Sequence, residues 1–120
     1  TMIRVSDPKD AAALFVDALQ MSVIAERHFP KESGDFSLLF YASLPAGTAL
    51  PDAENWAEAR EYMTDSNLCV LEITHNHGTE SDAAFSYHSG NTDPKGFGYV
   101  SFVVPDVATV LSTLTGKGFK

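Results

Sequence analysis

Apolar and polar positions follow two periods along the chain, which indicates a mixture of strands and helices. Short runs rich in β-branched and aromatic residues predict strands at 2–5, 21–27, 36–41, 69–74 and 97–104. Apolar residues at helical spacing predict helices after Asp7-Pro8 and after Pro105-Asp106, and a further helix is expected around 54–62. Together these elements predict an α+β fold.

The two best-marked helices begin in the same way. Asp7 can accept hydrogen bonds from free N–H groups, Pro8 suits the first helical position, and Asp106 follows a strand as Asp7 does. A strand that runs into a capped helix therefore occurs twice, but further strands follow only the first copy. Because a half-built sheet leaves an unpaired edge, we expect the native chain to extend beyond Lys120, or another chain to supply the missing strands.

Composition narrows the function classes. The 120 residues are 44% hydrophobic, which is enough for a core, and the formal net charge is −8. An acidic chain without a basic stripe disfavours nucleic-acid binding, and no apolar run approaches the length of a membrane-spanning helix, so membrane insertion is not expected. The single cysteine, Cys69, is expected to be a buried apolar residue. We expect an intracellular protein, either cytoplasmic or mitochondrial.

Four segments resemble one family in order and spacing: 1–9, 71–80, 86–98 and 103–107. The family is glyoxalase I (lactoylglutathione lyase), in the eukaryotic zinc-type branch of the vicinal oxygen chelate superfamily. Segment 93–98, which closes the polar loop, is typical of that branch. The resemblance implies paired βαβββ modules of the vicinal oxygen chelate fold. The first module would cover 1–75, an active-site-type loop 76–96, and the start of an incomplete second module 97–120, with a strand and a helix only.

The resemblance also implies a reaction. Members of the family isomerise the hemithioacetal of glutathione and methylglyoxal, with a zinc ion as Lewis acid and the active site commonly shared across a homodimer. The family takes two metal ligands from each module. One matches Glu72, and a histidine ligand is replaced by Tyr99. The positions of the other two would lie before Thr1 and beyond Lys120, outside the given sequence.

The family's substrate-binding residues match this sequence better than its metal ligands do. The resemblance assigns glutathione binding to a basic and an amide side chain, at Arg4 and Asn76, and places Lys95 where the family has a second arginine. Lysine keeps the charge but loses the bidentate fork for a carboxylate. The apolar pocket for the methyl end of the substrate corresponds to Phe29, Leu38 and Phe40, which ordinary core packing would also explain.

His75 and His77 form a His-x-His pair, and such a pair can hold a metal. Glu72 has the opposite parity along the strand, so the histidines would face away from it, and solvated loop histidines are the better interpretation. Two functional hypotheses remain. The incomplete metal site favours a degenerate, non-catalytic domain that serves as a structural or interaction subunit of a larger hetero-complex. The alternative is an active lactoylglutathione lyase that binds the glutathione adduct.

Overall fold

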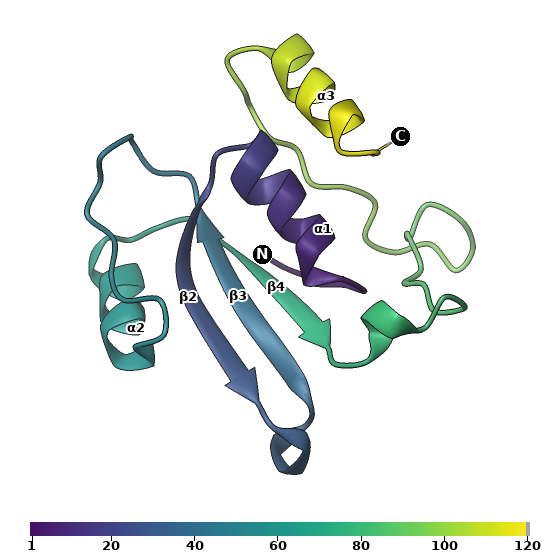
Figure 1. The fold of residues 1–120 in the computed structure, drawn as a ribbon, viewed down its shortest axis with the longest axis horizontal. Coiled ribbons are helices and arrows are strands. Elements are labelled where there is room, and N and C mark those ends of the chain that lie inside the picture. Colours follow the sequence, from purple (N-terminus) through teal and green to yellow (C-terminus); the bar gives the residue numbers. More distant parts are fainter. Residues whose placement is uncertain (120) are drawn as a thin grey trace.

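The computed structural model describes residues 1–119, so the predicted end of the second module at Lys120 lies outside the described residues. Its centre is a four-stranded sheet in the order β1-β4-β3-β2 (Figure 1). The strands are β1 (Met2–Val5), β2 (Ser22–Phe29), β3 (Phe36–Ala42) and β4 (Val70–Asn76). β1 runs parallel to β4, whereas β4 with β3 and β3 with β2 are antiparallel. The predicted α+β class is confirmed.

Helix α1 (Pro8–Ala12) packs on one face of the sheet and continues as a π-helix at Ala13–Ala18. Its start is as predicted, because the Asp7 carboxylate accepts a 2.8 Å hydrogen bond from the Lys9 backbone N–H. The inner side of this helical segment buries Phe15 against Tyr41 of β3, with ring centroids 5.7 Å apart. This contact belongs to a core that also contains Ile73 of β4.

Helix α2 (Trp56–Asp65) covers part of the opposite face of the sheet. It begins at Trp56, two residues later than predicted, because Asn55 is its N-terminal cap. The Asn55 side chain accepts a hydrogen bond from the Glu58 backbone N–H. Trp56 packs on Phe40 of β3, with ring centroids 5.5 Å apart. Ala59, on the side of α2 that faces the sheet, is fully buried. α2 contacts β2, at the far side of the sheet from β1, so the part of this face formed by β1 and β4 stays open.

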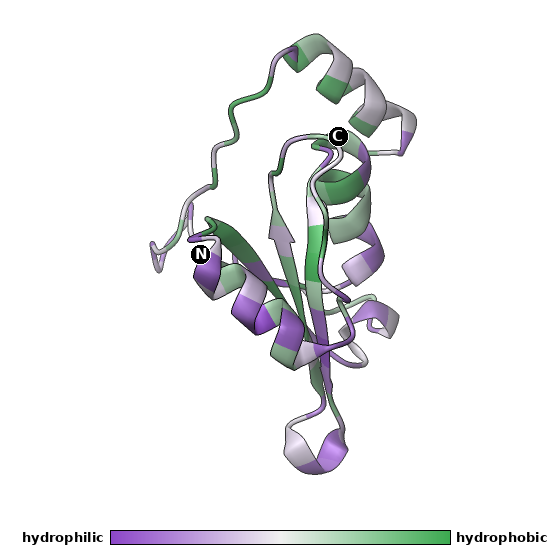
Figure 2. Cartoon of the chain, turned by 90° about the vertical axis from the view of Figure 1, so that its left-hand side faces the viewer, coloured by the Kyte–Doolittle hydropathy of each residue, from purple (hydrophilic) through white to green (hydrophobic). Residues whose placement is uncertain are grey.

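The strand predicted at 97–104 is wrong: this segment is irregular in the structure. An extended segment becomes a strand only when a neighbour accepts and donates its backbone hydrogen bonds, and none within residues 1–119 pairs with it. Much of the segment is hydrophobic yet exposed, including Val103 (Figure 2). The helix predicted after it does form, as α3 (Val107–Gly116) with Asp106 as its cap. The Lys117–Asp17 ion pair, 2.6 Å long, ties α3 to the π-helix.

Cys69 is exposed, so its predicted burial is also wrong. The reason is that β4 begins only at Val70, so Cys69 lies just outside the ladder whose alternation would have turned it inward. No helix among the described residues has the length and apolar character needed to cross a membrane.

Candidate functional site on the open sheet face

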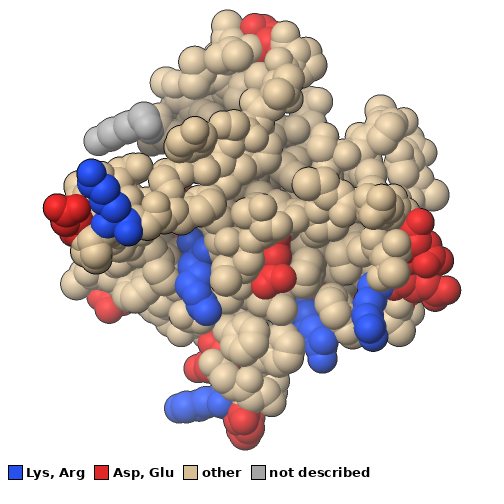
Figure 3. Space-filling view, turned by 180° about the vertical axis from the view of Figure 1, so that it is seen from behind, with Lys and Arg blue, Asp and Glu red and all other residues tan. Residues whose placement is uncertain are grey.

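Six of the eight predicted site residues lie on one face of the sheet, the face opposite α1. Strand register explains this, because Leu38 pairs with Thr74, which pairs with Arg4, while Phe40 pairs with Glu72 one pleat away. The six are Arg4 on β1, Phe29 on β2, Leu38 and Phe40 on β3, and Glu72 and Asn76 on β4. Viewed from behind, charges of both signs are interspersed on this side of the molecule (Figure 3).

The open part of this face holds a cavity of about 270 Å³. Its floor is made by β1, β3 and β4, and its lining includes Arg4, Leu38, Glu72 and Asn76, together with Thr74. A cation, a carboxylate and an amide therefore surround an apolar patch. Such a lining suits a ligand with a polar, charged end and an apolar end.

A chain of hydrogen bonds orients the polar side chains at the β1 edge. The Arg4 guanidinium donates to the Asn76 carbonyl oxygen at 3.1 Å, and the Asn76 amide nitrogen donates to the Tyr87 hydroxyl at 3.2 Å. Because the arginine can only donate, the Asn76 oxygen must face it and the NH₂ group must face Tyr87. The guanidinium therefore has a fixed direction, and because this is the one hydrogen bond that it donates within residues 1–119, its other N–H groups are available for a ligand.

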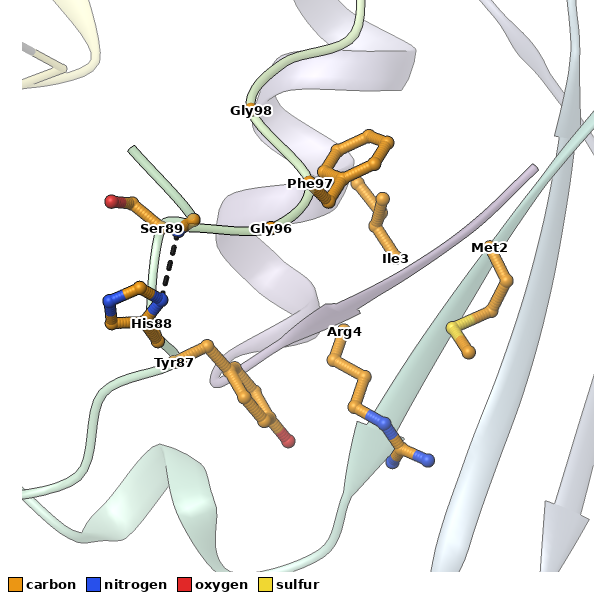
Figure 4. Close-up of a pocket in the computed structure, with 10 residues that line it drawn as sticks. Met2, Ile3, Arg4, Tyr87, His88, Ser89, Gly96, Phe97 and Gly98 are labelled. Atoms are coloured by element: carbon orange, nitrogen blue, oxygen red, sulfur yellow. Dashed lines mark hydrogen bonds between the residues drawn. The ribbon is translucent and has the colours of Figure 1, made fainter. Parts of the chain in front are cut away.

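A second cavity of about 650 Å³ lies between β1 and the loop that follows β4. Figure 4 shows Arg4 and Tyr87 projecting in the same direction from these two segments, with Phe97 on the other side of β1. The loop doubles back tightly at Gly90, where a Cβ would lie 1.9 Å from the Phe97 carbonyl oxygen and φ is +78°. Only glycine fits there, so this residue allows the loop to approach the backbone at Phe97 closely.

Two residues of the site were missed from the sequence. Tyr87 comes from a polar loop, and nothing in its neighbours indicates that its hydroxyl reaches Asn76. Arg27 lies over the rings of Phe29 and Trp56, 4.7 and 4.8 Å from their centroids, so a cation borders the predicted apolar pocket. The strand alternation could have identified Arg27, since it shares parity with Phe29.

The remaining two predicted residues, Lys95 and Tyr99, lie outside this cluster. Lys95 is exposed near the end of the loop, and Tyr99, which is 82% accessible, lies on the segment between the loop and α3. Catalytic zinc sites use three protein ligands as a rule, and within residues 1–119 no three His, Cys, Asp or Glu side chains come together in a way that could hold a metal. Glu72 supplies one carboxylate, so the described residues do not by themselves fit the metal that the resemblance implies.

His75 and His77 face away from the open cavity, as their parity predicts. His75 is buried and its Nε2 lies 2.8 Å from the Glu80 carboxylate, so the interpretation as a solvated loop histidine is wrong for it. The pKa of Glu80 is lowered, first by a hydrogen bond from its own backbone N–H and next by the bond to His75. His77 bonds to Ser37 and to Asp35.

Comparison with known proteins agrees with the sequence resemblance. The profile of the family described as "Glyoxalase/Bleomycin resistance protein/Dioxygenase superfamily" matches residues 1–120. A protein of Pseudomonas putida named lactoylglutathione lyase is 42% identical over 89% of the chain, and one of Pseudomonas aeruginosa with the same name is 43% identical over 89%. A yeast protein named glyoxalase I is 31% identical over 98%. The chain spans 58% and 57% of the two Pseudomonas proteins and 31% of the yeast protein.

Proposed function

The chain belongs to the glyoxalase/bleomycin resistance protein/dioxygenase superfamily, and from this premise we propose that it binds the glutathione adduct of a 2-oxoaldehyde as part of a lactoylglutathione lyase. The observation that carries the proposal is the convergence of Arg4, Asn76 and Glu72 around the apolar Leu38 on one open sheet face. A glutathione adduct has the matching chemistry, because its peptide carries carboxylates and its aldehyde-derived end is small and apolar.

Each side chain then has a role that its position supports. Arg4, braced by Asn76, binds a carboxylate of the glutathionyl part, because a guanidinium offers paired N–H donors to two oxygens. Leu38 contacts the apolar end of the adduct, whereas Phe40 is buried against Trp56 of α2 and does not line this cavity. Glu72 presents its carboxylate to the same cavity, and none of the ion pairs formed within residues 1–119 occupies it. No step through a metal ion follows from the described residues.

This proposal reverses the order of the two hypotheses drawn from the sequence. The degenerate structural subunit rested on Tyr99 replacing a histidine ligand, and Tyr99 lies on a segment that forms no strand, so the sheet does not fix its position relative to Glu72. The Pseudomonas and yeast relatives are named lactoylglutathione lyase or glyoxalase I, which favours the hypothesis of an active lactoylglutathione lyase. A subunit role, a homodimer and the use of Lys95 in binding remain predictions.

Isothermal titration with an S-alkylated glutathione tests the proposal. We expect saturable binding that Leu38→Glu weakens by at least about tenfold, because a carboxylate in the apolar patch opposes an anionic ligand and costs desolvation. Arg60→Glu on α2, away from this cavity, is the matched control and should keep the wild-type affinity. Absence of saturable binding, or equal affinity in Leu38→Glu, contradicts the proposal.

A further inference from the structure

A second group of ligand-type side chains lies on the other face of the sheet, near the β2–β3 hairpin. The Ser37 hydroxyl on β3 lies between two imidazoles, 2.7 Å from Nδ1 of His28 on β2 and 2.6 Å from Nε2 of His77, just after β4. Ser37 is 4% exposed, while the side chains of His28 and His77 are 68% and 34% exposed. The two rings therefore cover the hydroxyl and border solvent.

The proton positions follow from the partners. The Asp35 carboxylate lies 2.9 Å from His77 Nδ1, and a carboxylate accepts, so Nδ1 carries the proton and Nε2 directs a lone pair at Ser37 in the neutral ring. The backbone N–H of His77 also donates to the Asp35 carbonyl at 3.0 Å, which fixes the position of the residue. Two ring nitrogens thus converge on one point, and at least one of them presents a lone pair there.

Each imidazole also has a carboxylate beside its other nitrogen. Asp35 contacts Nδ1 of His77, and Glu26 lies 3.8 Å from Nε2 of His28. A carboxylate on the far nitrogen is the outer-shell arrangement of metal-binding histidines, because it sets the ring tautomer and makes the inner nitrogen a better donor. The two negative charges also favour a cation at this place in an acidic chain.

A hydrolytic role fits this cluster less well. Ser37, His77 and Asp35 are connected in the order of a nucleophilic triad. The Ser37 oxygen, however, lies beneath both rings, so an acyl group cannot reach it without displacing them. A metal ion is much smaller than an acyl group, so a smaller outward movement of the two rings makes room for a centre that binds imidazole nitrogen at about 2.0–2.1 Å.

We propose that His28 and His77, with the Ser37 hydroxyl between them, bind a divalent transition-metal ion on the sheet face opposite Glu72. Nitrogen donors select ions of the zinc, nickel or copper class over magnesium or calcium, which prefer oxygen. Two imidazoles and a hydroxyl leave positions for water, so the site is open. The ion would connect the ends of β2 and β3 to the segment after β4. This site does not depend on the proposed glutathione-adduct site.

Zinc titration of the purified chain, in competition with a chromogenic chelator, tests the site. The work uses a Cys69→Ser background, because the exposed thiol could bind zinc by itself. Asp35→Asn should weaken zinc binding by about 10- to 100-fold, as loss of an outer-shell carboxylate does. Asparagine is the suitable replacement because residue 35 has φ = +59°. His28→Ala and His77→Ala should each weaken binding at least as much.

Two variants separate this site from others. His88→Ala removes an exposed loop histidine and should change zinc affinity by less than twofold, while Glu72→Gln shows whether zinc binds on the opposite face instead. Thermal unfolding should rise with zinc in the background chain and stay constant in His28→Ala/His77→Ala, because a ligand that binds only the folded state stabilises it. The proposal is overturned if zinc does not bind saturably, if the double variant keeps the affinity, or if Glu72→Gln alone removes it.

Discussion

Arg4→Lys is the sharpest test of how the open face binds an anion. The change keeps the positive charge on β1 but removes the planar fork and the hydrogen bond that reaches Asn76. A hydrogen bond to a charged group contributes about 1.5–3 kcal/mol, and each 1.4 kcal/mol is a factor of about ten in affinity. Loss of one such bond to a ligand carboxylate therefore predicts a Kd for S-alkylated glutathione that rises about 10- to 150-fold.

Asn76 should act through Arg4, because its carbonyl oxygen holds the guanidinium from 3.1 Å. Asn76→Ala removes a neutral acceptor whose hydrogen bond is worth about 0.5–1.5 kcal/mol, so the Kd should rise about 2- to 12-fold. If Asn76 only positions Arg4, the double variant Arg4→Lys/Asn76→Ala should bind no more weakly than Arg4→Lys alone. The difference between the measured and the additive effect is the coupling free energy of the pair.

Isothermal titration calorimetry on the four proteins of this cycle gives the required Kd values, and circular dichroism checks that each variant is folded. Arg60→Lys on α2 is the matched control, since it makes the same chemical change at an arginine that lines neither of the two cavities described above. A twofold or smaller change in Arg4→Lys would refute a bidentate contact at this residue. Additive effects in the double variant would show that Asn76 contacts the ligand itself.

Two further predictions concern stability. Ile73→Ala should lower the free energy of unfolding by about 2–5 kcal/mol, because Ile73 is fully buried in the core under α1 and its truncation leaves a cavity. Urea unfolding measures this loss, and a loss below about 1 kcal/mol would contradict a central place for Ile73 in the core. The pKa of Glu80 is lowered in the folded chain, so its contribution is complete above the ordinary carboxyl value of 4.5 and is lost as the pH falls through the lowered value. Glu80→Gln should therefore destabilise the chain at pH 7 more than at pH 3, and an equal effect at both pH values would contradict this assignment.

The sequence predicted the first part of the fold well because local signals and packing agree there. Asp7-Pro8 marks the start of α1, and alternation in β4 places Glu72 and Ile73 on opposite faces, as the structure has them. Six site residues share one face because β1, β4, β3 and β2 pair in the register that the alternation requires. Their shared face could thus be predicted, while their functional roles rest on the resemblance and on the experiments above.

The failures share a physical cause, since each depends on what lies beside a segment rather than on its composition. The segment 97–104 has the composition of a strand, but a strand also needs a hydrogen-bonding neighbour. Cys69 lies in an apolar run and is exposed because the ladder begins one residue later. The local pattern of apolar and polar residues does not predict contacts between separate segments, such as Tyr87 with Asn76 and His28 with Ser37.

β1 carries Arg4, and this strand has only four residues and one neighbour in the sheet. A short strand that is paired on one side only among residues 1–119 opens locally at a lower free-energy cost than the global unfolding of a domain. Opening of β1 would remove the guanidinium from Asn76 and from the cavity while the core beneath α1 stays intact. Affinity for an anion on this face is therefore linked to the closing equilibrium of β1. A bound ligand would slow amide hydrogen exchange in Met2–Val5 selectively, and substitutions that loosen this strand would weaken binding without contacting the ligand.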